Sequence, residues 1–155
     1  MFDIFSGIVM KQNILVILLI SGYFFGCAGD STVKSSDYSD RAARIERLAE
    51  LFVLRSEVID TAYEIYDVNM NTRSIPGPTD RDYRIILKVD PRFLQLWHDP
   101  DLVTSLSVDY LWAEPILKHT DGFDLSGKAT QFVSENKQMI IFEETGVILV
   151  HLLQH

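Results

Sequence analysis

A glycine-rich stretch in the last third of the chain has the residue types of a phosphate-binding loop. Residues 122–129 read GFDLSGKA and match the pattern G-x-x-x-x-G-K. In such a loop a Ser or Thr after the lysine holds magnesium, a strand precedes the loop and a helix follows it. Here Ala129 stands at the metal position, and the residues after it favour a strand. We therefore interpret the stretch as a turn and predict no nucleotide or other cofactor.

The histidines do not form a recognisable catalytic or metal-binding set. His151 and His155 would share one face of a terminal strand, but no carboxylate or cysteine stands beside them. Such a pair is more often on the surface than at a metal site. Ser and Asp residues are numerous, yet no strained-turn signature marks a nucleophile. We predict no catalytic residue and no metal site from these residue types.

One cation, Arg55, lies where an apolar residue is expected. In a helix over residues 39–66 it would fall between Phe52 and Ile59, on the buried side. An unpaired buried guanidinium is costly, so Arg55 needs an acidic partner, water or an anionic ligand. It is therefore either in an ion pair with an aspartate of the following loop or part of a site for a carboxylate or phosphate. The residues of this candidate site are Arg55, Asp80, Asp82 and Arg84.

Cys27 is the single cysteine, so the chain can form no internal disulfide. It follows an apolar run, residues 14–25, and that run follows Lys11. The run is shorter than the roughly 20 apolar residues that a membrane-spanning helix needs. A basic start, a short apolar middle and small residues at the end are typical of a secretory signal.

With Gly26 directly before Cys27, residues 10–27 resemble the lipoprotein signal peptides of bacteria. The resemblance implies that the cysteine is diacylated on its sulfur before cleavage and becomes the mature N-terminus. It departs from the usual pattern at Phe24 and Phe25, where that family has Leu and a small residue. A signal that is cleaved without lipid and an uncleaved anchor stay open as alternatives. Beginning at Met10 gives a cleaner signal, which makes Met10 an alternative start.

The lipoprotein reading implies an organisation for the whole chain. We expect a signal peptide over 1–26, a lipidated flexible tether over 27–38 and a single domain over 39–155. Two acyl chains would hold the protein stably at a membrane. Ala28 replaces the aspartate that retains members of this family at the inner membrane, so the resemblance favours the outer membrane, facing the periplasm.

The net charge excludes some partners. Asp3 and Lys11 are the only charged residues before Cys27, so the rest of the chain carries the whole net charge of −8. So acidic a surface repels phosphate backbones and anionic headgroups, which argues against nucleic-acid binding and against peripheral membrane docking.

The spacing of apolar residues predicts a long helix from Ser39 or Asp40 to about Tyr66. Residues at spacings of three, four and seven form one apolar stripe. The stripe consists of Ile45, Leu48, Phe52, Ile59, Ala62 and Tyr66.

Strands are predicted in the second half. Residues 83–89 alternate and have a charged outer face that suits a sheet edge. Residues 139–142 and 147–150 flank a turn with Gly146 at the left-handed position, and residues 129–133 would complete a meander. Asp90-Pro91 and Asp99-Pro100 each favour the start of a short helix. Residues up to His119 are expected to be helical or irregular, interrupted by Pro115.

The hairpin strands are apolar on both faces, so we expect cover on both sides. The long helix would cover one face and residues 91–119 the other. Where this cover is missing, an apolar surface would remain for a partner. The candidate partner surface consists of Trp97, Tyr110 and Trp112. The expected fold class is α+β, with a long N-terminal helix packed on a small antiparallel sheet that ends in a C-terminal hairpin.

Two classes of function fit these features. The first is a lipid-anchored protein-interaction module, either an envelope accessory or an immunity-type inhibitor. The alternative is a small periplasmic enzyme or anionic-ligand carrier that uses the Arg55 region. A carrier should have a cavity with Arg55 on its wall, whereas an interaction module should expose an apolar sheet face or the segment from Trp97 to Trp112 and should lack a deep polar pocket.

Overall fold

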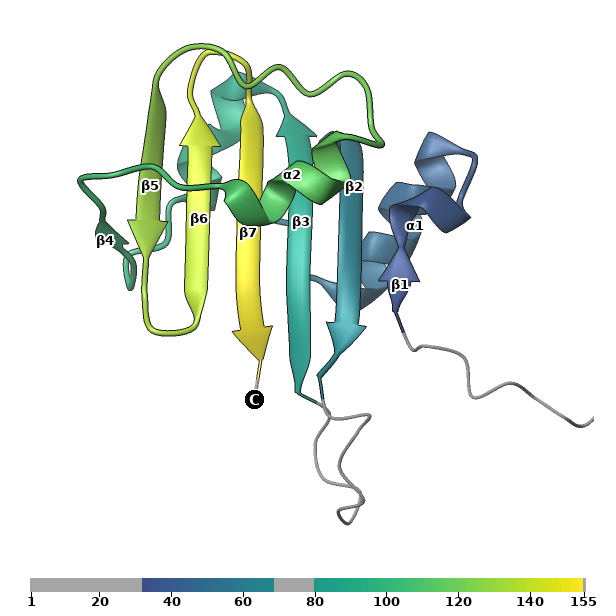
Figure 1. Ribbon diagram of the computed structural model, residues 1–155. Coiled ribbons are helices and arrows are strands. Elements are labelled where there is room, and N and C mark those ends of the chain that lie inside the picture. Colours follow the sequence, from purple (N-terminus) through teal and green to yellow (C-terminus); the bar gives the residue numbers. More distant parts are fainter. Residues whose placement is uncertain (1–31, 69–79, 155) are drawn as a thin grey trace, which may run out of the picture. The chain divides into compact units, whose positions relative to one another are not determined.

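The computed structural model describes residues 32–68 and 80–154, which belong to one compact unit (Figure 1). The expected signal peptide and the lipidation site Cys27 lie outside the described residues. The strands are β1 (Val33–Lys34), β2 (Val58–Asp67), β3 (Arg81–Val89), β4 (Val103–Thr104), β5 (Ala129–Val133), β6 (Lys137–Phe142) and β7 (Val147–Gln154). The helices are α1 (Arg41–Leu51) and α2 (Glu114–Leu117), with the 3₁₀ helices η2 (Ser35–Asp37), η3 (Pro91–Trp97) and η4 (Leu111–Ala113).

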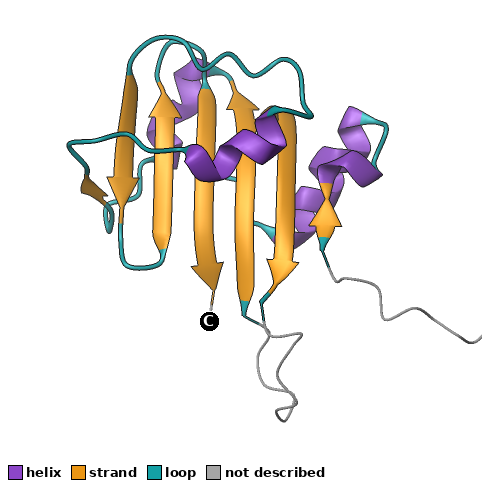
Figure 2. Ribbon diagram, viewed as in Figure 1, coloured by secondary structure: helices purple, strands orange, loops and turns teal. Residues whose placement is uncertain are grey.

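A seven-stranded antiparallel sheet dominates the fold, in the order β1-β2-β3-β7-β6-β5-β4. The helices are short pieces on the two sides of this sheet (Figure 2). The expected long helix on a small sheet is therefore wrong. Within the described residues, no helix is both long enough and apolar enough to cross a bilayer.

The first helix is much shorter than predicted. Asp40 caps α1 by accepting a hydrogen bond from the Ala43 N–H at 3.1 Å, and the helix ends at Leu51. Residues 58–66 of the predicted helix belong to β2 instead. This segment is rich in β-branched and aromatic residues, which fit a pleated surface better than a helix. Tyr63, absent from the predicted stripe, is fully buried.

The prediction of a strand over residues 83–89 is confirmed, but its expected place at a sheet edge is wrong. β3 lies between β2 and β7. The charged residues of its outer face have partners there: Arg84 is 2.8 Å from Asp82, and Lys88 donates to the carbonyl of Gly122 at 3.4 Å. Pairing of these side chains allows a strand with charges to occupy the middle of a sheet.

The C-terminal meander is confirmed. β5 covers the predicted residues 129–133, and β6 and β7 form the predicted hairpin. Gly146 has a φ of +70°, the left-handed conformation that the turn requires. An added Cβ there would collide with the carbonyl oxygen of Val89, so the position also lacks space for a side chain.

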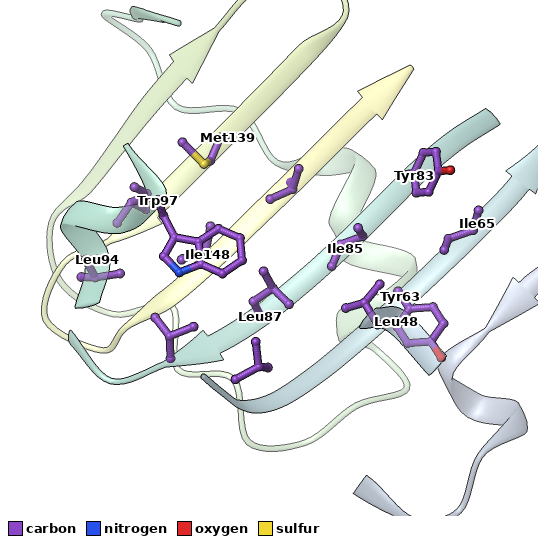
Figure 3. Packing of buried hydrophobic residues seen from close by; sticks show 14 residues of the cluster. Leu48, Tyr63, Ile65, Tyr83, Ile85, Leu87, Leu94, Trp97, Met139 and Ile148 are labelled. Atoms are coloured by element: carbon purple, nitrogen blue, oxygen red, sulfur yellow. The ribbon is translucent and has the colours of Figure 1, made fainter. Parts of the chain in front are cut away.

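Both faces of the sheet are covered, as the hairpin strands indicated. On one face α1 and η3 pack on a core that contains Leu48, Tyr83 and Trp97 (Figure 3). On the other face η4 and α2 cover Ile86 and Leu149. Figure 1 shows α2 lying across this second face. Residues 91–119 therefore divide between the two faces, instead of covering one as expected.

Three local expectations need correction. Residues 33–37, assigned to the flexible tether, pair with β2 and form η2, with Ser35 buried. Asp99-Pro100 begins a turn before β4, whereas Asp90-Pro91 does begin a short helix, η3. Pro115 lies in the first turn of α2, where proline is tolerated, so it does not interrupt a helix.

Candidate functional site

Arg55 lies in the loop between α1 and β2 and belongs to a charged network with Asp99 and Lys137. Its guanidinium donates to the Asp99 carboxylate at 3.1 Å and to the carbonyl of His98 at 3.2 Å. Asp99 also accepts from Lys137 at 2.6 Å. The side chains of Arg55, Lys137 and Asp99 are 34%, 17% and 14% exposed. The expected ion pair therefore exists, but its partner is Asp99 and not Asp80 or Asp82.

This network holds the pKa of Asp99 below its ordinary value. The hydrogen bond from Lys137 is the largest cause, while burial works in the opposite direction and Arg55 adds to the lowering. The carboxylate therefore stays ionised at neutral pH and can hold both cations in place. Two cations share one carboxylate, so the network has a local positive charge.

A groove of about 510 Å³ lies beside the network, and we call it the cationic groove. It is lined by Leu51, Phe52, Val53, Arg55, Tyr83, Trp97, Asn136, Lys137, Met139, Val150, Leu152 and Gln154. Tyr83, Trp97 and Met139 lie on the same face of the sheet (Figure 3). Arg55 thus lines a cavity.

Asp82 and Arg84 are brought together on the opposite face of the sheet. Arg84 donates twice to the Asp82 carboxylate, at 2.8 and 3.0 Å, and His151 contacts the same carboxylate at 2.9 Å. Burial raises the pKa of Asp82, but the hydrogen bonds from His151 and Arg84 outweigh it, so this pKa is lowered. The Trp112 ring packs on His151, with ring centroids 5.2 Å apart.

The cluster at Asp82 also includes a perturbed tyrosine. Tyr66 contacts Glu64, and the Arg84 guanidinium lies 5.2 Å from the centre of its ring. Burial, together with the hydrogen bond to Glu64, raises the pKa of Tyr66 to about 12. The phenol therefore stays protonated across the physiological range. Asp80 lies at the start of this region, and its carbonyl accepts from the Val68 N–H at 2.8 Å.

The three aromatic residues of the expected partner surface have different places. Trp97 is buried in the core, where its indole N–H donates to Ser56 at 2.9 Å. Tyr110 packs edge-on against Phe142, and Trp112 is half-buried over His151. These rings are part of the cover of the sheet, so the aromatic residues themselves do not form an exposed surface.

The aliphatic residues between these aromatics are exposed instead. Val103 is 71% exposed, Val108 41% and Leu111 69%, while Leu106 is fully exposed. We call these four residues the apolar rim. Val103 lies on β4, which is an edge strand of the sheet. The apolar rim lies in the segment expected to form the partner surface, but the aromatic residues of that segment bury the most area and are part of the cover of the sheet.

The backbone of the apolar rim is fixed by two glutamines of the sheet. Gln131, which is buried, accepts from the Asp109 N–H at 2.7 Å. Gln138 donates to the Asp109 carbonyl at 2.5 Å. The Ser105 N–H donates to the carbonyl of Gln131 at 2.8 Å. The exposed aliphatic side chains are therefore presented from an ordered segment.

A second cavity, of about 650 Å³, lies between η2, β2 and the residues after α2. Its charged groups are largely paired with each other: Lys34 is 3.3 Å from Glu64, and Arg44 is 3.0 Å from Asp60. Nowhere in residues 32–68 and 80–154 do three or more His, Cys, Asp or Glu side chains gather as a metal site would require.

A scan against protein-family models, a search of curated proteins and a search of solved structures each found no match.

Proposed function

We propose that this chain is an exported bacterial lipoprotein that acts by non-catalytic contact with a protein partner. Acyl chains on Cys27 would hold it at the cell envelope, at the outer membrane and facing the periplasm. The folded part would serve as an envelope accessory or an immunity-type inhibitor. The support for the anchor is the signal-like pattern of residues 10–27.

The observation that carries the interaction role is the apolar rim. Exposed aliphatic residues that occur singly need no explanation, but contiguous ones mark interaction sites. The four exposed residues of the apolar rim lie within nine residues of the sequence, 103–111, and we propose that they act as one surface. Because Gln131 and Gln138 fix the backbone at Asp109, little ordering entropy would be lost when a partner binds this segment.

The apolar rim lies at an edge of the sheet, and the shortness of the edge strand limits how a partner can bind there. Within the described part of the chain β4 pairs with β5 alone, and it has two residues. A strand this short protects the edge against unspecific pairing. A partner with an apolar surface could therefore cover Val103 and Leu106 without adding a long strand.

The interaction role is tested with a photo-crosslinking amino acid at Leu106 in the full chain, expressed in the bacterium that encodes it. We expect one crosslinked protein, and we expect Leu111→Asp in the same chain to remove that crosslink. A crosslinker at Ile59 is the positional control, since this residue is exposed on β2 near the other end of the sheet. Equal capture from both positions, or capture that survives Leu111→Asp, would refute the interaction role.

The anchor is tested separately through Cys27. Radiolabelled palmitate should enter the wild-type chain, and Cys27→Ser should abolish both the label and the membrane fractionation. If Cys27→Ser leaves processing and fractionation unchanged, the lipoprotein assignment is wrong. The crosslinking result does not depend on this outcome, because it reports on the folded part alone.

A further inference from the structure

We propose that the cationic groove binds an anionic amphiphile, a molecule with one hydrocarbon chain that ends in a carboxylate. This inference goes beyond the contact of the apolar rim with a protein. It concerns the other end of residues 91–119, where Trp97 and Asp99 border the groove and its charged network.

The size and lining of the groove suit such a ligand. Its volume of about 510 Å³ lies within the roughly 300–1,000 Å³ of small-molecule sites, which are mostly apolar with a few placed polar groups. The sheet supplies a floor of nearly buried side chains, among them Met139 and Val150. Phe52 and Leu152 are half-buried, and Val53 is 81% exposed. These three side chains, together with half-buried Leu51, have surface left for a hydrocarbon chain.

The charges select an anion. Among the described residues that line the groove, the charged ones are Arg55 and Lys137, both cations. They occur in a chain whose net charge is −8. A carboxylate that enters the groove would therefore meet two cations, although most of the protein would repel it.

The two cations keep donors for a ligand. Asp99 uses a single oxygen, Oδ2, to accept from both Arg55 and Lys137. Arg55 also donates from its other terminal nitrogen to the carbonyls of Trp97 and His98, at 3.5 and 3.2 Å. A guanidinium has five N–H donors and an ammonium three, so these acceptors do not use them all. The contacts to Asp99 and to the two carbonyls hold the cations in a fixed place, which favours binding.

The second cavity does not have this character. Its lining includes Asp60, Glu64 and Asp121 as well as Lys34 and Arg44. Charges of both signs that already pair with each other give an anion no net attraction. The cationic groove is therefore the place where apolar lining and unbalanced positive charge coincide.

The experiment uses the full chain in a total lysate of the cells that express it, so that the result does not depend on membrane attachment. The probe is a long-chain fatty acid that carries a diazirine on its chain and a terminal alkyne. After irradiation, the labelled peptides are identified by mass spectrometry. We expect saturable labelling that maps to residues of the groove, such as Phe52, Val53 or Leu152. The alcohol with the same chain should label at least about fivefold less, because it lacks the charge.

A matched pair of variants isolates the charge effect. Val53→Glu puts a negative charge on the lip of the groove without touching the core, and should reduce labelling about fivefold or more. Val103→Glu makes the same change at a residue of similar exposure on β4, and should leave labelling unchanged. Both variants should retain the wild-type unfolding midpoint, since both positions are exposed.

Three results would overturn the proposal: equal labelling by acid and alcohol, equal effects of the two variants, or labels that map outside the groove. A label on Cys27 alone would count against a ligand in the groove. The crosslinking test at Leu106 concerns a different surface, so the two proposals can fail independently.

Discussion

The charged network at Asp99 gives the sharpest test of the structural reasoning. We consider Asp99→Asn, which keeps the size and one oxygen of the side chain but removes its charge. Lys137 and Arg55 would then lose the carboxylate that lies 2.6 and 3.1 Å from them. Within the described residues neither cation pairs with another carboxylate, so Lys137 would depend on water and Arg55 on water and the backbone carbonyls.

The cost can be estimated from the exposure of the three side chains. An ion pair on the surface contributes about 0–1 kcal/mol, and breaking a buried pair costs about 3–5 kcal/mol. Lys137 and Asp99 are 17% and 14% exposed, closer to the buried limit, whereas Arg55 at 34% is closer to the surface. We therefore expect Asp99→Asn to lower the free energy of unfolding by about 2 kcal/mol.

The matched control is Asp90→Asn, because Asp90 also precedes a proline and also pairs with an arginine. Its partner Arg92 is exposed, and an asparagine can still cap η3 through its side-chain oxygen. The control should unfold as the wild type does. Urea denaturation followed by the fluorescence of buried Trp97 measures both variants.

The pH dependence of the stability difference between wild type and Asp99→Asn provides the stricter test. The pKa of Asp99 is lowered on folding, so its contribution is present above the ordinary pKa of about 3.9 and is lost as the pH falls through the lowered value. The difference between wild type and Asp99→Asn should be constant above about pH 5 and shrink below about pH 4. A difference that stays constant down to pH 2, or no difference at pH 7, would refute the reasoning.

Two further predictions concern the turn and the core. Gly146→Ala should lower the free energy of unfolding by about 3 kcal/mol, because a Cβ at this left-handed position collides with the Val89 carbonyl. Gly122→Ala should lower it by about 1–2 kcal/mol, because a Cβ there has open space. Urea midpoints that rank the two variants the other way would contradict this. Leu149→Ala should cost about 2–5 kcal/mol because its side chain is fully buried, whereas Leu106→Ala at the exposed apolar rim should stay within about 0.5 kcal/mol of the wild type in the same assay.

The C-terminal half of the fold could be predicted because its signals are local. The β6–β7 hairpin follows from two apolar runs around a turn with Gly146, and η3 follows from the Asp90 cap and its proline. Apolar residues on both faces of the hairpin strands correctly required cover on both sides. Each of these features depends on residues close together in the chain.

The spacing of apolar residues alone could not show that the predicted long helix is wrong. Ile45 and Leu48 do pack on the sheet from α1, so the first part of the stripe is real. The stripe continues through Ile59 and Ala62 only by coincidence, because β2 is buried along both faces and shows no clean alternation. The β-branched and aromatic content of β2 was the signal that outweighed the helical period.

The partners of the charged residues depend on contacts that are distant in sequence. Arg55 and Lys137 both reach Asp99, and Asp82 reaches His151, across loops or strands. The sequence around Asp99 indicates a helix cap, and nothing in the sequence around Lys137 indicates its ion pair. A loop that brings Asp99 beside Arg55 cannot be inferred from either residue's neighbours.

The separation of Arg55 from Asp82 and Arg84 changes what a ligand site can be. Side chains of adjacent residues in a strand point to opposite faces, so Tyr83 lines the cationic groove while Asp82 and Arg84 lie on the other face. A small ligand at Arg55 therefore cannot also touch the Asp82 cluster. Arg55 is therefore separate from Asp82 and Arg84, with which the sequence suggested a common site, and a variant at Arg84 should leave a ligand at Arg55 unaffected. If Arg55 binds a ligand, the second cation of that site is Lys137, which contacts the same Asp99 carboxylate.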